Sequence, residues 1–96
     1  MTRREIIQLC FGERQSKIEN LQKQLKEFDE ECEKLEFEEN MYYHLKNYNP
    51  HYSSVYEQKQ EENLKRTEEL ETKNKEIQED IKILQREIDY INDKLG

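Results

Sequence analysis

The sequence predicts an all-α fold, an antiparallel coiled-coil hairpin of two long helices. Apolar residues in both halves of the chain recur with the alternating spacing of three and four residues that marks a coiled-coil seam. Hydrophobic residues make up only 32% of the chain and charged residues 41%, which is enough for stripes on helices but too little for a globular core. The one proline, Pro50, lies between the two stripes. We therefore expect a single coiled-coil unit over residues 1–96.

The first helix is expected over about residues 3–47. Its stripe consists of Ile7, Phe11, Ile18, Leu21, Leu25, Phe28, Cys32 and Leu35. Arg14 falls on the same stripe and interrupts it. Beyond Leu35 the same spacing reaches Glu39, Tyr42 and Lys46, so the seam becomes polar toward the middle of the chain.

A turn is expected over residues 48–53. Pro50 has no backbone N–H, and its ring disfavours the helical conformation at Asn49. Ser54, followed three residues later by Glu57, has the pattern of a capping box, which starts a new helix. A kink within one continuous helix is the alternative, but a stop signal beside a start signal favours a reversal of the chain.

The second helix is expected over about residues 54–95. Its stripe consists of Leu70, Ile77, Ile81, Leu84, Ile88, Ile91 and Leu95. Asn74 lies at a seam position, where an asparagine often determines the register of a coiled coil. Nearer the turn the same spacing reaches polar or amphipathic side chains: Tyr56, Gln60, Asn63 and Thr67.

Antiparallel pairing centred next to Pro50 brings the two stripes into register. The expected layers include Ile7 with Leu95, Leu21 with Ile81, and Cys32 with Leu70. A two-helix hairpin with so few apolar layers is marginally stable, so we expect two hairpins to form a dimeric four-helix bundle or to bind a partner helix. A parallel assembly of kinked chains is the remaining alternative.

Charge is unevenly distributed along the chain, whose net charge is −7. Residues 1–26 contain six Arg and Lys against three Glu, whereas residues 27–40 contain eight acidic residues against Lys34 alone. An acidic chain without a basic stripe is not expected to bind nucleic acid or a membrane. The acidic stretch is interpreted as a solvated helix face, with a docking site for a basic protein as the alternative.

Carboxylates are abundant but lie in helical runs without an apolar pocket, and the histidines and cysteines are few and scattered. His44 and His51 flank the turn, and neither a Cys-x-x-Cys nor a His-x-x-x-His spacing occurs. Cys10 and Cys32 are too far apart along one helix to form a disulfide. We expect no enzyme, no cofactor and no metal, in an intracellular protein of the cytoplasm or nucleus.

Two groups of apolar and aromatic side chains lie beside the seams and are candidate interaction surfaces. The first, near the turn, is Phe37, Met41, Tyr42, Tyr43, Leu45, Tyr48, Tyr52 and Tyr56. The second, near the chain ends, is Ile6, Leu9, Cys10, Ile83 and Tyr90. Tyrosine and methionine are enriched at protein interfaces, although the aromatic residues near the turn could equally fill the end of the hairpin.

The sequence thus predicts a non-enzymatic coiled-coil interaction or scaffold element, such as the N-terminal part of a larger cytoskeletal, kinetochore-like or tethering protein. Its expected partner is a protein, either a second copy or a helix of another subunit. The alternative is a small acidic regulator or chaperone-like adaptor that binds a basic protein. Association through apolar layers should persist at about 0.5 M NaCl, whereas binding through charge should weaken.

Overall fold

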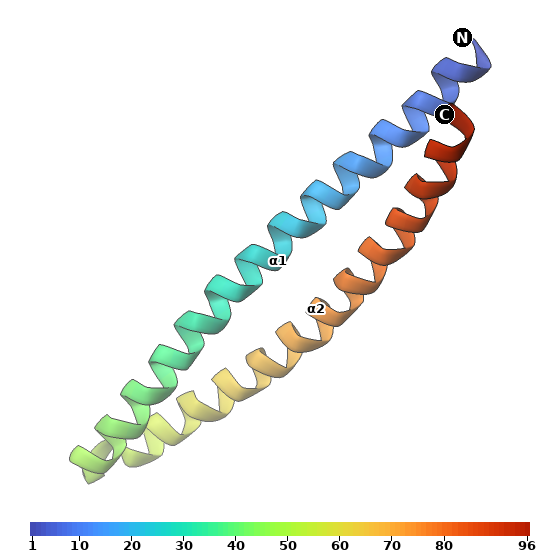
Figure 1. The fold of residues 1–96 in the computed structure, drawn as a ribbon. Helices are drawn as coiled ribbons and strands as arrows, with labels where there is room; N and C mark the ends of the chain where they lie inside the picture. The colour runs from blue at the N-terminus through green and yellow to red at the C-terminus, as the bar shows by residue number, and fades with distance from the viewer. The chain divides into compact units, whose positions relative to one another are not determined.

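The computed structural model describes all 96 residues, and nearly all of them are helical (Figure 1). Helix α1 spans Arg3–Tyr48, a short 3₁₀ helix η1 spans Pro50–Tyr52, and helix α2 spans Ser53–Leu95. The two α-helices have 46 and 43 residues, and the chain has no β-strand. The prediction of an all-α fold with two long helices is confirmed.

The N-terminus of α1 is capped by Thr2 and Glu5. The Glu5 backbone N–H donates to the Thr2 hydroxyl at 3.2 Å, and that hydroxyl donates to the Glu5 carboxylate at 3.1 Å. Glu5 also lies in the first turn of α1, and Lys46 and Lys94 lie in the last turns of α1 and α2. These charges oppose the partial charges at the helix ends, so each is placed where it stabilises its helix.

The chain reverses around Pro50. Asn49 leaves the helical conformation, with φ −128° and ψ 87°, and Pro50 then begins η1. The Tyr52 N–H donates to the Asn49 carbonyl at 3.1 Å, and the Ser53 N–H donates to the Pro50 carbonyl. Because η1 leads directly into α2 at Ser53, Ser54 lies inside the first turn of α2, and the expected capping box with Glu57 does not form.

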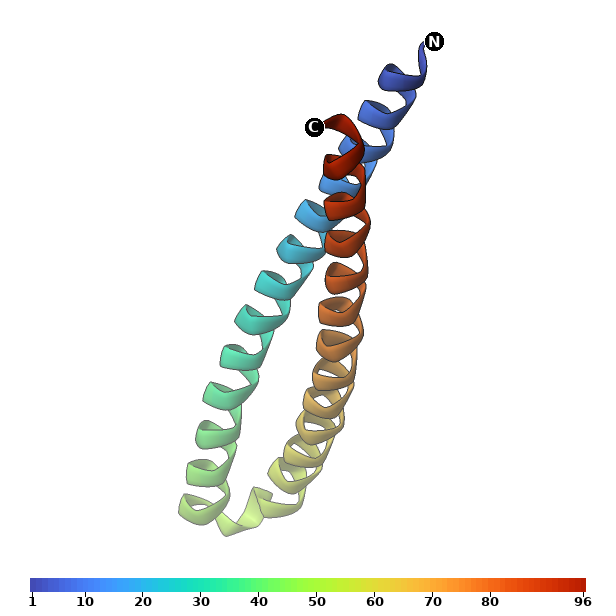
Figure 2. The ribbon, with the colours of Figure 1, turned by 45° about the vertical axis from the view of Figure 1, so that its right-hand side comes forward.

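The chain divides into two compact parts. The terminal unit consists of Met1–Lys26 and Lys75–Gly96, and the turn unit consists of Glu27–Asn74. In the turn unit, α1 and α2 form a helical hairpin closed by η1 (Figure 1). In the terminal unit, the first part of α1 and the last part of α2 run side by side in opposite directions, with both chain ends at the same end (Figure 2).

The core of each unit is a single seam between two helices. Leu35 and Leu70 are buried in the turn unit and Ile77 is buried in the terminal unit, and these three are the only buried residues of the chain. Every other apolar residue of the two predicted stripes is half-buried, because in a pair of helices each seam residue is covered from one side only. The apolar stripes are therefore placed as the sequence predicts.

The seam near the turn differs from the prediction at one position. The polar seam residues Tyr42, Lys46, Tyr56, Gln60, Asn63 and Thr67 are half-buried, as their spacing predicts. Glu39, however, is exposed, and its neighbour Glu38 is half-buried instead. The Glu38 carboxylate accepts hydrogen bonds from the Asn63 amide at 3.3 Å and the Tyr42 hydroxyl at 3.1 Å, while Glu39 accepts one from the Gln60 amide at 3.0 Å. Both carboxylates thus contact α2, but Glu38 is the more covered of the two.

Candidate interaction surfaces

An open groove lies between α1 and α2 in the terminal unit. Its volume is about 630 Å³, and its surface is mainly apolar. The apolar side chains that line it are Ile6, Ile7, Cys10, Tyr90 and Ile91. Clefts that bind ligands or partner side chains commonly have volumes of this size and an apolar lining.

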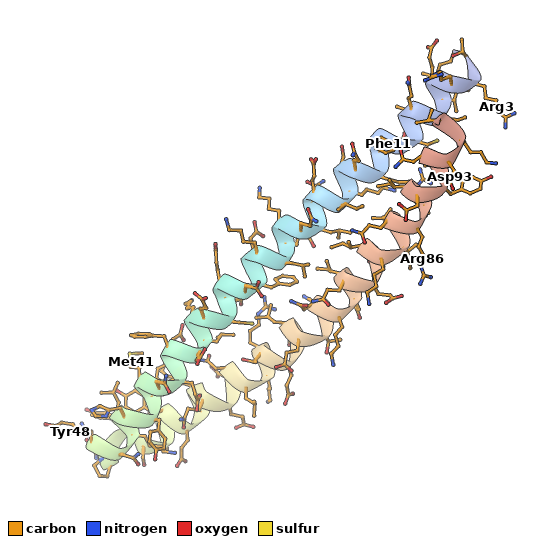
Figure 3. All side chains as sticks on the ribbon, in the orientation of Figure 1. Arg3, Phe11, Met41, Tyr48, Arg86 and Asp93 are labelled. Atoms are coloured by element: carbon orange, nitrogen blue, oxygen red, sulfur yellow. The ribbon has the colours of Figure 1, made fainter.

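Charged residues surround this groove. The basic side chains are Arg3, Arg14, Arg86 and Lys94, against the single carboxylate of Glu87. Arg14 donates from Nε to Glu87 at 3.1 Å and from Nη1 to the Cys10 carbonyl at 3.1 Å. The Lys94 ammonium lies 5.2 Å from the centre of the Tyr90 ring. Arg3 and Arg86 form no ion pair within the chain and point outward from the ribbon (Figure 3).

The structure brings together three of the five residues predicted as the surface near the chain ends. Ile6, Cys10 and Tyr90 line the groove, with Ile6 and Tyr90 exposed and Cys10 half-buried. Leu9 is exposed outside the groove. Ile83 is also exposed and lines a second, smaller depression of about 380 Å³ in the same unit.

The residues predicted as a surface near the turn fall into two sets. The exposed set is Phe37, Met41, Tyr43, Tyr48 and Tyr52, with Phe37 at 70% and Tyr48 at 81% exposure. The half-buried set is Tyr42, Leu45 and Tyr56. Figure 3 shows Met41 and Tyr48 on the side of α1 that points away from α2.

Tyr42 and Tyr56 pack against each other within the hairpin. Their ring centres lie 6.0 Å apart with an interplanar angle of 23°, and Lys59 lies 5.9 Å from the Tyr42 ring centre. Burial, together with the hydrogen bond to Glu38, raises the pKa of the Tyr42 phenol. These two tyrosines fill the space between the helices, whereas the exposed set remains open to a partner.

Polar contacts connect the two helices of the turn unit farther from the turn than this aromatic pair. The Arg66 guanidinium donates from Nε and Nη2 to the two oxygens of Glu31, at 2.7 Å and 3.1 Å. The hydrogen bond from Arg66 lowers the pKa of Glu31 and raises that of Arg66. The hydrogen bond from Asn63 lowers the pKa of Glu38 in the same way. These carboxylates therefore belong to the contact between the helices.

Two further apolar residues of the turn unit were not among the predicted surface residues. Leu64 is 60% exposed and lines a groove of about 570 Å³, and Val55 is 47% exposed. Leu64 directly follows the seam residue Asn63, in a stretch whose preceding residues are polar. A search for apolar residues next to seam positions would have found it.

Cys32 and Cys10 are free thiols. Burial, followed by the nearby carboxylates of Asp29, Glu31 and Glu71, raises the pKa of the Cys32 thiol. No group of three or more His, Cys, Asp and Glu side chains is arranged to hold a metal ion. Neither helix contains a segment apolar and long enough to cross a membrane.

Comparison with known proteins gives no match: no known family, curated protein sequence or solved structure is significantly similar to this chain.

Proposed function

We propose that the chain is a coiled-coil interaction element that associates with itself, two copies forming a four-helix assembly, and that it has no catalytic role. The observation that supports this proposal most directly is the balance of buried and exposed apolar side chains. Only three residues are buried, whereas twelve large hydrophobic side chains are exposed. Helices with so much uncovered apolar surface are typical of proteins that complete their packing in an assembly.

The energetics of a helix pair favour the same conclusion. Full burial of one large apolar side chain contributes about 1.5–3 kcal/mol, while ordering the backbone costs about 1–2 kcal/mol per residue. With most seam residues only half-buried, a single pair of helices stays close to the limit of stability. A second copy that covers Phe37, Ile6 or Tyr90 would add the missing apolar contacts.

A second candidate function is favoured by the charge of the turn unit. Glu27–Asn74 contains fourteen Asp and Glu against six Lys and Arg, whereas the terminal unit contains nine against ten. An acidic surface of this kind would suit an adaptor that binds a basic protein. Such binding depends on charge and weakens as salt screens it.

Size-exclusion chromatography with light scattering, combined with circular dichroism on the same sample, tests the proposal. We expect strong helicity and a mass of about twice the 11.9 kDa of one chain, both unchanged at about 0.5 M NaCl because apolar contacts are little screened. A helical monomer across the micromolar range would contradict self-association and leave the adaptor as the better candidate. A disordered monomer would contradict both.

A further inference from the structure

We infer that the groove of the terminal unit receives one particular face of a second copy, the face of α1 that carries Phe37 and Met41. This inference rests on the proposed self-association and names the surfaces that meet. A second copy suits the groove because the chain itself contains a helix face that complements it in length, apolarity and charge.

The lengths of the two surfaces correspond. On α1 the groove is lined from Arg3 to Arg14, eleven residues apart or about 16 Å along a helix. The face that would fill it runs from Glu30 to Met41, also eleven residues apart. Glu30, Glu33, Phe37 and Met41 follow one another at steps of three and four residues, so their side chains lie along one side of α1.

The apolar parts of the two surfaces also correspond. Phe37 and Met41 are exposed one turn apart on α1. A neighbouring helix in the groove would place these two side chains on the apolar lining of Ile6, Cys10 and Tyr90. The thioether of methionine adapts to irregular surfaces and contacts aromatic rings favourably, which suits the Tyr90 ring.

Charge is complementary at the two surfaces. The groove has four basic residues against Glu87, and Arg3 and Arg86 form no ion pair within their own chain. Glu30 and Glu33 are exposed and also form no ion pair within the chain. Pairing these carboxylates with the guanidinium groups around the groove would orient the second copy and disfavour partners of like charge.

The contact therefore joins two different surfaces, the groove of one copy and the Phe37 face of another, and in a dimer it forms twice, once in each direction. A contact between unlike surfaces fails when either one is altered, and it is restored when both are altered so that they match again. Reversing the charges of one surface, and then of both surfaces together, therefore tests whether these two surfaces meet.

The test is a set of full-length variants whose dissociation constants are compared by light scattering and analytical ultracentrifugation at low salt. Arg3→Glu with Arg86→Glu reverses both unpaired arginines of the groove, so the result does not depend on the direction of the bound helix. Glu30→Lys with Glu33→Lys reverses the opposite face. Each pair of substitutions should weaken self-association about tenfold or more, and the four together should restore it to within about threefold of the wild type.

The matched control is Arg4→Glu with Lys23→Glu, which makes the same change of charge at exposed positions of α1 outside the groove. This control should leave self-association unchanged and should not be rescued by Glu30→Lys with Glu33→Lys. Circular dichroism of every variant verifies that helicity is retained.

The outcomes separate this inference from the proposed function. If the wild type self-associates but the groove variant does so equally well, or if the four substitutions together give no rescue, the copies meet through other surfaces and the inference is wrong. If the wild type is monomeric at every concentration, the proposed self-association and this inference both fail.

Discussion

Arg66 and Glu31 form a two-point ion pair between the helices of the turn unit, with Nε–Oε1 at 2.7 Å and Nη2–Oε2 at 3.1 Å. Arg66 also contacts Glu69 on its own helix at 3.2 Å. Planar guanidinium and carboxylate groups match each other at two points, so this pair links the two helices with a defined geometry. Glu31 lies one turn before the buried Leu35 on α1, and Arg66 lies one turn before the buried Leu70 on α2.

Acid should destabilise the turn unit through Glu31. The hydrogen bond from Arg66 lowers the folded-state pKa of Glu31 below its ordinary value of 4.5, and Glu38 is shifted in the same direction. Such a group stabilises the folded state above pH 4.5, and this stabilisation is lost as the pH falls through the lowered pKa. In urea denaturation at pH 7 and pH 3, Glu31→Gln should lose less stability on acidification than the wild type. Glu33→Gln, which removes a carboxylate without an ion pair, is the control and should lose as much stability as the wild type. A loss in Glu31→Gln equal to that of the wild type would contradict this assignment.

Leu70 should contribute more to stability than any other residue of the turn unit. It is 1% exposed, and replacing a fully buried leucine with alanine typically costs about 2–5 kcal/mol. Leu64→Ala is a matched control because Leu64 lies on the same helix and is 60% exposed. Its cost should be about 0.5 kcal/mol or less, provided that it is measured on the unassociated chain. Urea denaturation followed by circular dichroism gives both values, and similar costs would show that Leu70 is not the centre of the core.

The Arg14–Glu87 pair should add little to the stability of the terminal unit. The two side chains are 29% and 38% exposed, and partly exposed pairs contribute about 0.2–1 kcal/mol. A double-mutant cycle with Arg14→Leu and Glu87→Leu measures this coupling. The doubly substituted chain should be at least as stable as the wild type, because two leucines would continue the apolar seam. A loss of more than about 2 kcal/mol in the double variant would show that the pair stabilises the unit in another way.

Cys32 should react slowly with alkylating reagents in the folded protein. Burial and the carboxylates around it raise the pKa of its thiol, which lowers the fraction of reactive thiolate at neutral pH. In a Cys10→Ser background, the rate of iodoacetamide modification at about pH 7.5 should rise severalfold when urea unfolds the chain. The same rate in folded and unfolded protein would mean that neither burial nor the carboxylates protect this thiol.

The sequence predicts the apolar part of this fold well because one physical cause dominates there. Residues such as Leu70 and Ile77 repeat with the period of a helix seam. Pro50 has no backbone N–H to continue the preceding helix, so α1 ends before it. The burial of polar residues at the seam depends instead on individual contacts with the opposite helix. Periodicity predicted Glu39 at the seam, but Glu39 is exposed although it accepts a hydrogen bond from Gln60, and Glu38, which accepts from Asn63 and Tyr42, is half-buried.

The candidate surfaces were predictable in part for the same reason. Apolar residues off the seam could be recognised from spacing, which placed Ile6 and Tyr90 in a common region, and both line the groove. Spacing placed Tyr42, but not Tyr43, at the seam, yet both were grouped in one candidate surface because their aromatic character alone does not tell a ring that fills the hairpin from one that is exposed. Tyr42 packs on Tyr56, whereas Tyr43 is exposed.

That difference predicts separate effects on association and on stability. Replacing the exposed residues Phe37, Met41 and Tyr43 with serine should leave the helicity of the unassociated chain largely intact and weaken self-association about tenfold or more, because their apolar surface is uncovered within one chain. Tyr42→Ser should instead lower the stability of the chain, because it removes the ring that packs on Tyr56 and the hydroxyl that donates to Glu38. Light scattering over a concentration series measures the first effect, and urea denaturation at low concentration measures the second. If the triple variant self-associates as tightly as the wild type but is less stable to urea at low concentration, these side chains fill the end of the hairpin and have no role in assembly.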